Sequence, residues 1–139
     1  MGTDVLARLS DEHDILLPLI VEIQAAAESQ DHTALIAELV AGRAALTDEL
    51  DAHIALEEGV AFTIIENFVG EEFVTPFRKE HAEICGLRDT VLAGLDSGRV
   101  PVSLCLQLCD LIQAHMQRED MMLFPSARNA LDSEVLEIP

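Results

Sequence analysis

Two copies of the pattern His-x-x-x-Glu, one in each half of the chain, are the residues best suited to do chemistry. His53 and Glu57 form the first copy, and His115 and Glu119 form the second. Because residues four apart lie on one face of a helix, each pair directs an imidazole and a carboxylate the same way. A lone histidine precedes each copy, and four imidazoles with two carboxylates are a suitable donor set for two metal ions. The candidate ligands are therefore His13, His53, Glu57, His81, His115 and Glu119.

The rest of the sequence predicts helices that can position these six side chains. Apolar residues recur at spacings of three and four along four segments, and turn-forming residues separate the segments. The predicted helices cover about residues 3–28, 33–68, 71–97 and 101–129. No segment carries a strand signal, and residues 131–139 are expected to be loose or to pack on the outside. We therefore expect an all-α protein, an up-down-up-down four-helix bundle formed by a single domain over residues 1–139.

The candidate ligands lie within the apolar stripes of their helices, which directs them into the bundle. The stripe of the second helix continues past Glu57 to Phe68, and the stripe of the fourth continues past Glu119 to Met122. Pro18 interrupts the first helix, so that helix either kinks there or starts anew at Pro18. We favour the kink, because it leaves the lone histidine of this segment inside the bundle.

A metal pair would account for two carboxylates in a helical core. Burying them without a cation would cost about several kcal/mol each, and no lysine or arginine lies on the stripes near them. In the expected arrangement the first two helices hold one ion and the last two hold the other. The assignment is His13 and His53 to one metal, His81 and His115 to the second, and Glu57 and Glu119 as bridges. A bundle whose histidines are only hydrogen-bonded core residues is the alternative without metal.

The composition excludes several classes of function. Eight Lys and Arg residues against 26 Asp and Glu residues give a formal net charge of −18, so neither nucleic acid nor an anionic membrane is an expected partner. No apolar run is long enough to span a membrane. Three cysteines, an odd number, favour a reducing compartment, and we expect a cytoplasmic protein without a secretion signal.

The six residues, with the run LFP at 123–125, resemble the hemerythrin-like HHE cation-binding domains over nearly the whole chain. The resemblance implies a hemerythrin-like bundle around a non-haem di-iron centre that is oxo- or hydroxo-bridged. It also implies dioxygen, peroxide or nitric oxide as the small-molecule ligand. Imidazole and carboxylate donors by themselves suit iron, manganese or zinc, so the resemblance is what selects iron.

Two positions depart from the oxygen-carrying members of that family. Where the carriers have a second histidine on the third helix, this chain has Cys85, which could be a thiolate ligand, a redox-sensitive neighbour or a small core residue. Where the carriers use a carboxylate five residues after the last histidine, this chain has Asp120, although Glu119 matches the spacing of Glu57. Glu58 is a further candidate for an outer or exchangeable ligand. His32 lies between helices and is expected to be exposed.

Two functions are compatible with this site. The first is binding or sensing of dioxygen, of related small redox molecules or of iron. The second is an enzyme that disproportionates hydrogen peroxide, as a catalase does, or oxidises ferrous iron at the same centre. The sequence allows a homo-oligomer, and it lacks the Glu-x-x-His motif that ferritin-like di-iron bundles require.

Overall fold

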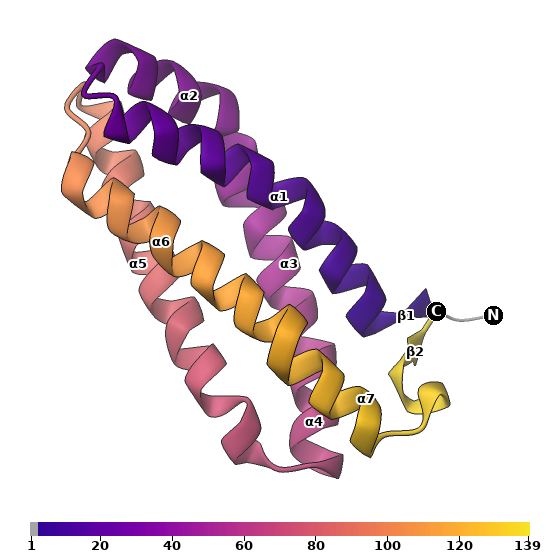
Figure 1. Ribbon diagram of the computed structural model, residues 1–139. Helices are drawn as coiled ribbons and strands as arrows, with labels where there is room; N and C mark the ends of the chain where they lie inside the picture. The colour runs from indigo at the N-terminus through magenta and orange to yellow at the C-terminus, as the bar shows by residue number, and fades with distance from the viewer. Residues whose placement is uncertain (1–2) are drawn as a thin grey trace.

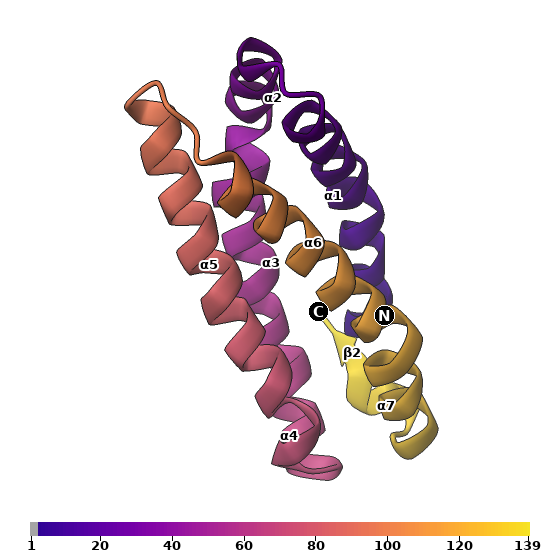
Figure 2. The same ribbon diagram turned by 60° about the vertical axis from the view of Figure 1, so that its left-hand side comes forward.

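The computed structural model describes residues 3–139, so the first two residues of the predicted domain lie outside the described part. Within that part the chain is an all-α bundle, as the apolar periodicity predicts. Four long helical runs lie side by side (Figures 1 and 2). The runs are α1 (Val5–Glu28), residues 32–68, α5 (Thr75–Asp96) and residues 102–130.

Two of the four runs are composites in which five-residue π-helical turns interrupt the α-helix. Residues 32–68 comprise α2 (His32–Ala44), η1 (Ala45–Glu49), α3 (Leu50–Leu56), η2 (Glu57–Ala61) and α4 (Phe62–Phe68). Residues 102–130 comprise α6 (Val102–Arg118), η4 (Glu119–Leu123) and α7 (Phe124–Ala130). Two of the π-turns therefore begin at the glutamates that the sequence singles out, Glu57 and Glu119.

Local chemistry explains where the helices begin. Asp4 and Asp31 accept hydrogen bonds from backbone N–H groups at the starts of α1 and α2, which satisfies donors that the helix leaves free. A 3-10 turn, η3 (Glu71–Phe73), leads into α5. Pro101 lies just before α6 rather than inside its first turn. The joints at 29–31 and 97–101 lie at one end of the bundle, and the joint before α5 lies at the other (Figure 1).

Helix α1 continues through Pro18, so a new start at that residue is wrong. Pro18 and Asp14, whose carbonyl the ring would crowd, are both on the exposed side of the helix. Solvent can hydrate the carbonyl that lacks a partner there, and His13 keeps its place in the buried face. A kink at this position stays a prediction.

The π-turns shift the buried face by one residue, and the predicted stripes are wrong beyond them. Phe68 and Met122 were expected inside but are 64% and 63% exposed. After Glu119 the buried side chains are Leu123 and Phe124 rather than Met122. A π-turn inserts one extra residue into an α-helix, so every later side chain rotates by one position.

The apolar core has two parts, one on each side of the histidines. One cluster runs through the middle of the bundle toward the joints at 29–31 and 97–101 and includes Leu16. The other lies toward the chain ends and includes Leu9, Phe62 and Phe124. Because His13 lies between Leu9 and Leu16 on one helix face, the predicted ligands occupy the layer between the two clusters.

The end of the described chain is ordered against its beginning, in contrast to the expected absence of strands. Thr3–Asp4 (β1) pairs with Glu137–Ile138 (β2) in a two-stranded antiparallel ladder. A 3-10 turn, η5 (Ser133–Leu136), precedes the second strand, and Leu136 is fully buried in the cluster near the chain ends. Over residues 3–139, no helix combines the length and the apolar run that a membrane span requires.

Candidate metal centre

The structure brings all six candidate residues together in one buried cluster. Their donor atoms form two groups of four, and the atoms of each group lie within 4.8 Å of one another. Glu57 and Glu119 belong to both groups. The first group is completed by His13 and His53, and the second by His81 and His115. The pairing expected from helix order is therefore the pairing that the fold produces.

The two glutamates each face both groups. One oxygen of Glu57, Oε2, lies 3.4 Å from Nε2 of His53, and the other, Oε1, lies 2.8 Å from Nε2 of His81. Oε1 of Glu119 lies 3.2 Å from Nε2 of His13 and 3.3 Å from Nε2 of His115. Both carboxylates are thus placed to bridge two ions.

Each of the four histidines directs its other ring nitrogen, Nδ1, at a carboxylate. The distances are 2.6–2.9 Å. The partner carboxylates are only partly buried, so they remain in contact with solvent. The pairs are His13 with Asp120, His53 with Glu12, His81 with Glu58, and His115 with Glu80. Such carboxylate–imidazole pairs fix the orientation and the tautomer of histidines that bind metals.

Neutral imidazoles in this arrangement would have no proton on the inner nitrogens. A carboxylate accepts hydrogen bonds, so each Nδ1 would donate and each neutral ring would keep a lone pair on Nε2. Nε2 of His13 and Nε2 of His53 lie 3.2 Å apart, and in the neutral rings two lone pairs at that distance would repel each other. A cation between them would convert this repulsion into coordination.

Six buried atoms of the cluster have no hydrogen-bond partner among the residues that the structure describes. They are both carboxylate oxygens of Glu57, both of Glu119, and Nε2 of His81 and of His115. Buried polar atoms are rarely left unsatisfied, because each costs about 1–3 kcal/mol or more. The residues present therefore fit a pair of metal ions.

The ionisation of the glutamates shows the same need for positive charge. Burial and the neighbouring Glu57 raise the pKa of Glu119 well above its usual range. Burial also opposes ionisation of Glu57, but the adjoining Glu119 carboxyl and the histidine rings hold its pKa well below its usual range. Two dications would favour the ionised form of both groups. Arg88, the nearest buried cation, instead bonds to the carbonyl of Leu46 and the carboxylate of Asp51.

The acidic residues that were alternatives for the site occupy different positions. Glu119 lies in the cluster, whereas Asp120 points to Nδ1 of His13 and also accepts a hydrogen bond from the Ser10 hydroxyl at 2.7 Å. Glu58 likewise occupies an outer position, on His81, where Arg78 contacts it.

Sequence reasoning missed the two other outer carboxylates, Glu12 and Glu80. Each immediately precedes a lone histidine, so the dipeptide Glu-His occurs once in each half of the chain. The repetition of this dipeptide was the sequence signal that could have indicated Glu12 and Glu80. Glu80 also forms an ion pair with Arg118. Although partial burial opposes ionisation, the hydrogen bonds from Arg118 and His115 lower the pKa of Glu80.

Two phenylalanines confine the histidines that lack the His-x-x-x-Glu spacing. The ring of Phe62 stacks on His81 with centroids 5.4 Å apart, and the ring of Phe124 stacks on His13 at 6.1 Å. Phe62 and Phe124 each follow a π-turn, which brings them into the core. The turns thereby close the cluster on the side of the chain ends.

The cysteines and the fifth histidine lie outside both groups. Cys85 is half-buried and belongs to neither donor group, and burial raises the pKa of its thiol. Cys105 and Cys109 are buried, form no disulfide, and lie in the apolar cluster that includes Leu16. His32 is exposed, as expected.

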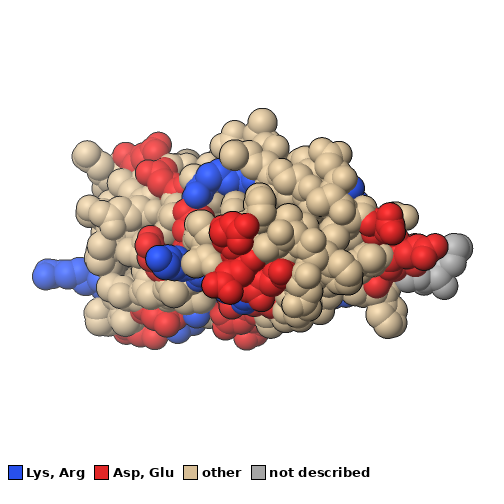
Figure 3. Space-filling model, turned by 90° about the horizontal axis from the view of Figure 1, so that it is seen from below, with Lys and Arg blue, Asp and Glu red and all other residues tan. Residues whose placement is uncertain are grey.

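The surface reflects the acidic composition. On the face shown in Figure 3, acidic side chains form several groups among fewer basic ones. This distribution gives no continuous basic patch on the visible face.

Comparison with known proteins gives limited information. No family model matches the chain, and no solved structure matches it. A DNA nickase of Nostoc sp. (strain PCC 7120) is 30% identical over 89 residues, which cover 64% of this chain and 25% of the nickase. The matched segment is thus a quarter of the length of that relative.

Proposed function

We propose that the chain is a hemerythrin-like protein of the HHE type, with an up-down-up-down bundle around a non-haem di-iron centre. In this proposal it binds or senses dioxygen, or a related small redox molecule. The observation that supports it is the buried His4Glu2 set with six unpartnered donor atoms and an outer carboxylate on every imidazole. Iron rather than manganese or zinc rests on the resemblance to that family.

The metal ions would supply redox chemistry and open coordination positions for a small ligand. The protein residues supply the rest: the four outer carboxylates orient the imidazoles, and the phenylalanines exclude water on one side. Each group of four side chains, two histidines with the shared Glu57 and Glu119, would hold one ion. Fewer than six protein donors would leave positions free at both ions.

Metal analysis combined with the visible spectrum tests this proposal. We expect about two irons per chain and colour in the oxidised protein, and mixing the reduced protein with dioxygen should change the spectrum. His115→Ala removes a cluster nitrogen and should lower the metal content, whereas His32→Ala removes an exposed imidazole and should not. A colourless protein without stoichiometric metal, or equal metal content in both variants, would contradict the proposal.

A second candidate function uses the same open positions. Because the two donor groups share Glu57 and Glu119, ions held in them would be neighbours, and such a centre would supply the redox chemistry that converts two molecules of hydrogen peroxide to one of dioxygen and two of water. Oxygen evolution from added hydrogen peroxide by the iron-loaded protein would favour this enzyme. Consumption of dioxygen during repeated oxidation of added ferrous iron would favour ferrous oxidation instead. The lack of either reaction in a protein that binds dioxygen reversibly would favour the sensor.

The nickase match does not extend this proposal to DNA. It covers a quarter of that protein, and a net charge of −18 opposes contact with a phosphate backbone. We also propose a cytoplasmic location, since the three cysteines are free.

A further inference from the structure

A small void lined only by apolar residues lies within the apolar cluster that includes Leu16. Its walls come from α1, the 32–68 run and α6, and nine of its ten lining residues are buried. The centre of a water-sized sphere can move through about 10 Å³ of this void, which is room for one small molecule. The void is therefore a site for one small molecule at most.

The void adjoins the histidines on three helical runs. Residues three apart on a helix are neighbours, with Cβ atoms about 5–6 Å apart. Three lining residues are each placed in this way from a cluster histidine: Leu16 from His13, Leu50 from His53, and Ile112 from His115. A molecule in the void is thus about one helical turn from the proposed metals.

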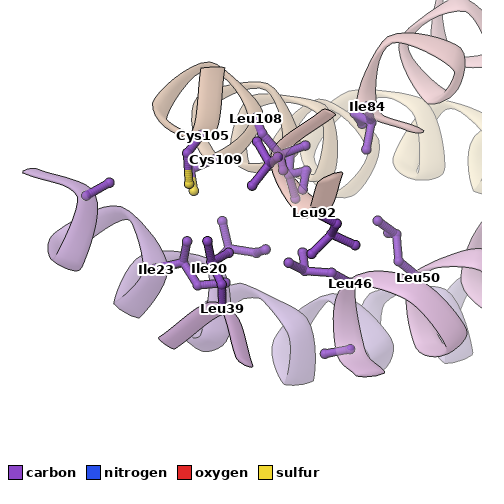
Figure 4. Packing of buried hydrophobic residues seen from close by; sticks show 14 of the residues in the cluster. Ile20, Ile23, Leu39, Leu46, Leu50, Ile84, Leu92, Cys105, Leu108 and Cys109 are labelled. Atoms are coloured by element: carbon purple, nitrogen blue, oxygen red, sulfur yellow. The ribbon is translucent and has the colours of Figure 1, made fainter. Parts of the chain in front are cut away.

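A buried glycine keeps this space open. Gly42 lines the void within α2, and a Cβ added there would contact only Cδ1 of Ile23, at 3.4 Å. Glycine inside a helix is less favourable than alanine, and here alanine meets no severe clash. Side chains including Ile20, Ile23 and Leu46 point into this part of the bundle (Figure 4). Packing alone therefore does not account for the glycine.

The lining selects the chemistry of the occupant. A polar molecule would lose its hydration without gaining a hydrogen bond, and small apolar cavities of this kind stay dry while accepting non-polar guests. A non-polar diatomic gas meets both conditions of size and polarity.

We propose that this void is a docking site for a non-polar or weakly polar diatomic gas, dioxygen or nitric oxide, on its way to the proposed metal pair. The reaction of the docked gas rests on the proposed function, but its binding in the void does not. The two can therefore be tested separately.

The first experiment measures methyl relaxation in the zinc-loaded chain under dioxygen pressure, with argon as the reference. If the chain takes up no zinc, the chain as isolated is used. Paramagnetic dioxygen should give saturable enhancement at the methyls of Leu16, Leu50, Ile112 and Met116, well above that of Leu6 in the other cluster. Weak enhancement of equal size at all these methyls would overturn the proposal.

The second experiment fills the void. Gly42→Ala, and independently Ala45→Val, should abolish the saturable enhancement. Gly86→Ala is the matched control, because it also replaces a helical glycine but has nothing within 4 Å of its Cβ. Circular dichroism confirms that each variant folds. Retained enhancement in a folded, filled variant would refute the site.

The third experiment measures association of each gas with the reduced iron protein. Filling the void should slow the association of at least one gas several-fold relative to Gly86→Ala. The gas whose association is slowed, dioxygen, nitric oxide or both, is the one that the void supplies. Unchanged rates for both gases would show that the void does not supply the metals. If the iron protein reacts with neither gas, the proposed function fails while the relaxation result still decides whether the void binds gas.

Discussion

The carboxylate of Asp120 accepts a hydrogen bond from Nδ1 of His13 at 2.8 Å, although the two residues are 107 positions apart in the chain. The contact joins the first helical run to the last, next to Glu119, which both donor groups share. It also shows how a residue adjacent in sequence to one candidate ligand can orient a different candidate ligand in space.

Asp120→Asn should weaken metal binding about 10- to 100-fold without changing the number of ions bound, because the amide still accepts a hydrogen bond but makes the imidazole less basic. Competition with a coloured chelator measures the affinity. Asp14→Asn, which changes an exposed aspartate on the same helix as His13, is the control. Equal affinities in the two variants would show that the outer carboxylate has no effect on the metal.

Glu119→Gln should have opposite effects on stability with and without metal. In the metal-free chain it removes a buried carboxyl whose ionisation is opposed by burial and by Glu57, so the free energy of unfolding should rise by about 1–3 kcal/mol. In the metal-loaded chain it removes a bridging ligand, so the free energy of unfolding should fall. Urea denaturation with and without chelator measures both, and Glu83→Gln, an exposed glutamate, is the control. A change of the same sign in both states is incompatible with a cation site.

Two helical glycines should respond oppositely to replacement by alanine. Gly86→Ala should raise the free energy of unfolding by about 0.5–1 kcal/mol, because alanine favours the helix and its Cβ meets nothing within 4 Å. Gly94→Ala should lower the free energy of unfolding, because its Cβ would lie 2.5 Å from Cδ of Pro101 and 2.7 Å from the carbonyl of Arg99. Thermal melts compare the two variants, and a Gly94→Ala melt at or above the wild-type temperature would mean that this loop approaches α5 less closely.

The ion pair of Asp4 with Arg128 should make a small contribution to stability that depends on pH. Partial burial opposes ionisation, but the hydrogen bonds from Arg128 and Ala7 lower the pKa of Asp4 below its ordinary 3.8. The stabilisation is therefore present above that value and is lost as pH falls through the lower pKa of the folded state. Asp4→Asn keeps the helix cap but not the charge, so it should cost less than about 1 kcal/mol at neutral pH. The difference between variant and wild type should vanish in acid; a constant difference would mean that the charge is not involved.

The helices and the inward direction of the six cluster residues followed from the apolar periodicity alone. The periodicity failed beyond Glu57 and Glu119, where a π-turn displaces the stripe and leaves Phe68 and Met122 in solvent. Single-residue insertions of this kind leave no compositional trace, because the extra residue is an ordinary one. An alternative apolar stripe, shifted by one position and passing through Phe124, is also present in the sequence, but nothing in the composition favours it over the unshifted stripe.

The outer carboxylates were harder to predict because their partners lie on other helices. Glu12 orients His53 rather than its neighbour His13, and Glu80 orients His115 rather than His81. Consecutive residues on a helix point about 100° apart, so a glutamate does not contact the histidine that directly follows it in the sequence. The short strand pair at the chain ends was missed because two residues are too few for an alternation pattern.

In each half of the chain, one histidine is oriented by a carboxylate of the same half and the other by a carboxylate of the opposite half. Residues up to 68 contribute two imidazoles and one bridging carboxylate, and the residues after them contribute the same set. Each half, however, depends on one carboxylate of the other half: Asp120 orients His13, and Glu58 orients His81. A peptide corresponding to one half would carry every type of donor and still lack a complete centre. Two copies of such a helical hairpin, related by a twofold axis through the His–Glu cluster, would supply each other's missing carboxylates and rebuild the cluster as a dimer.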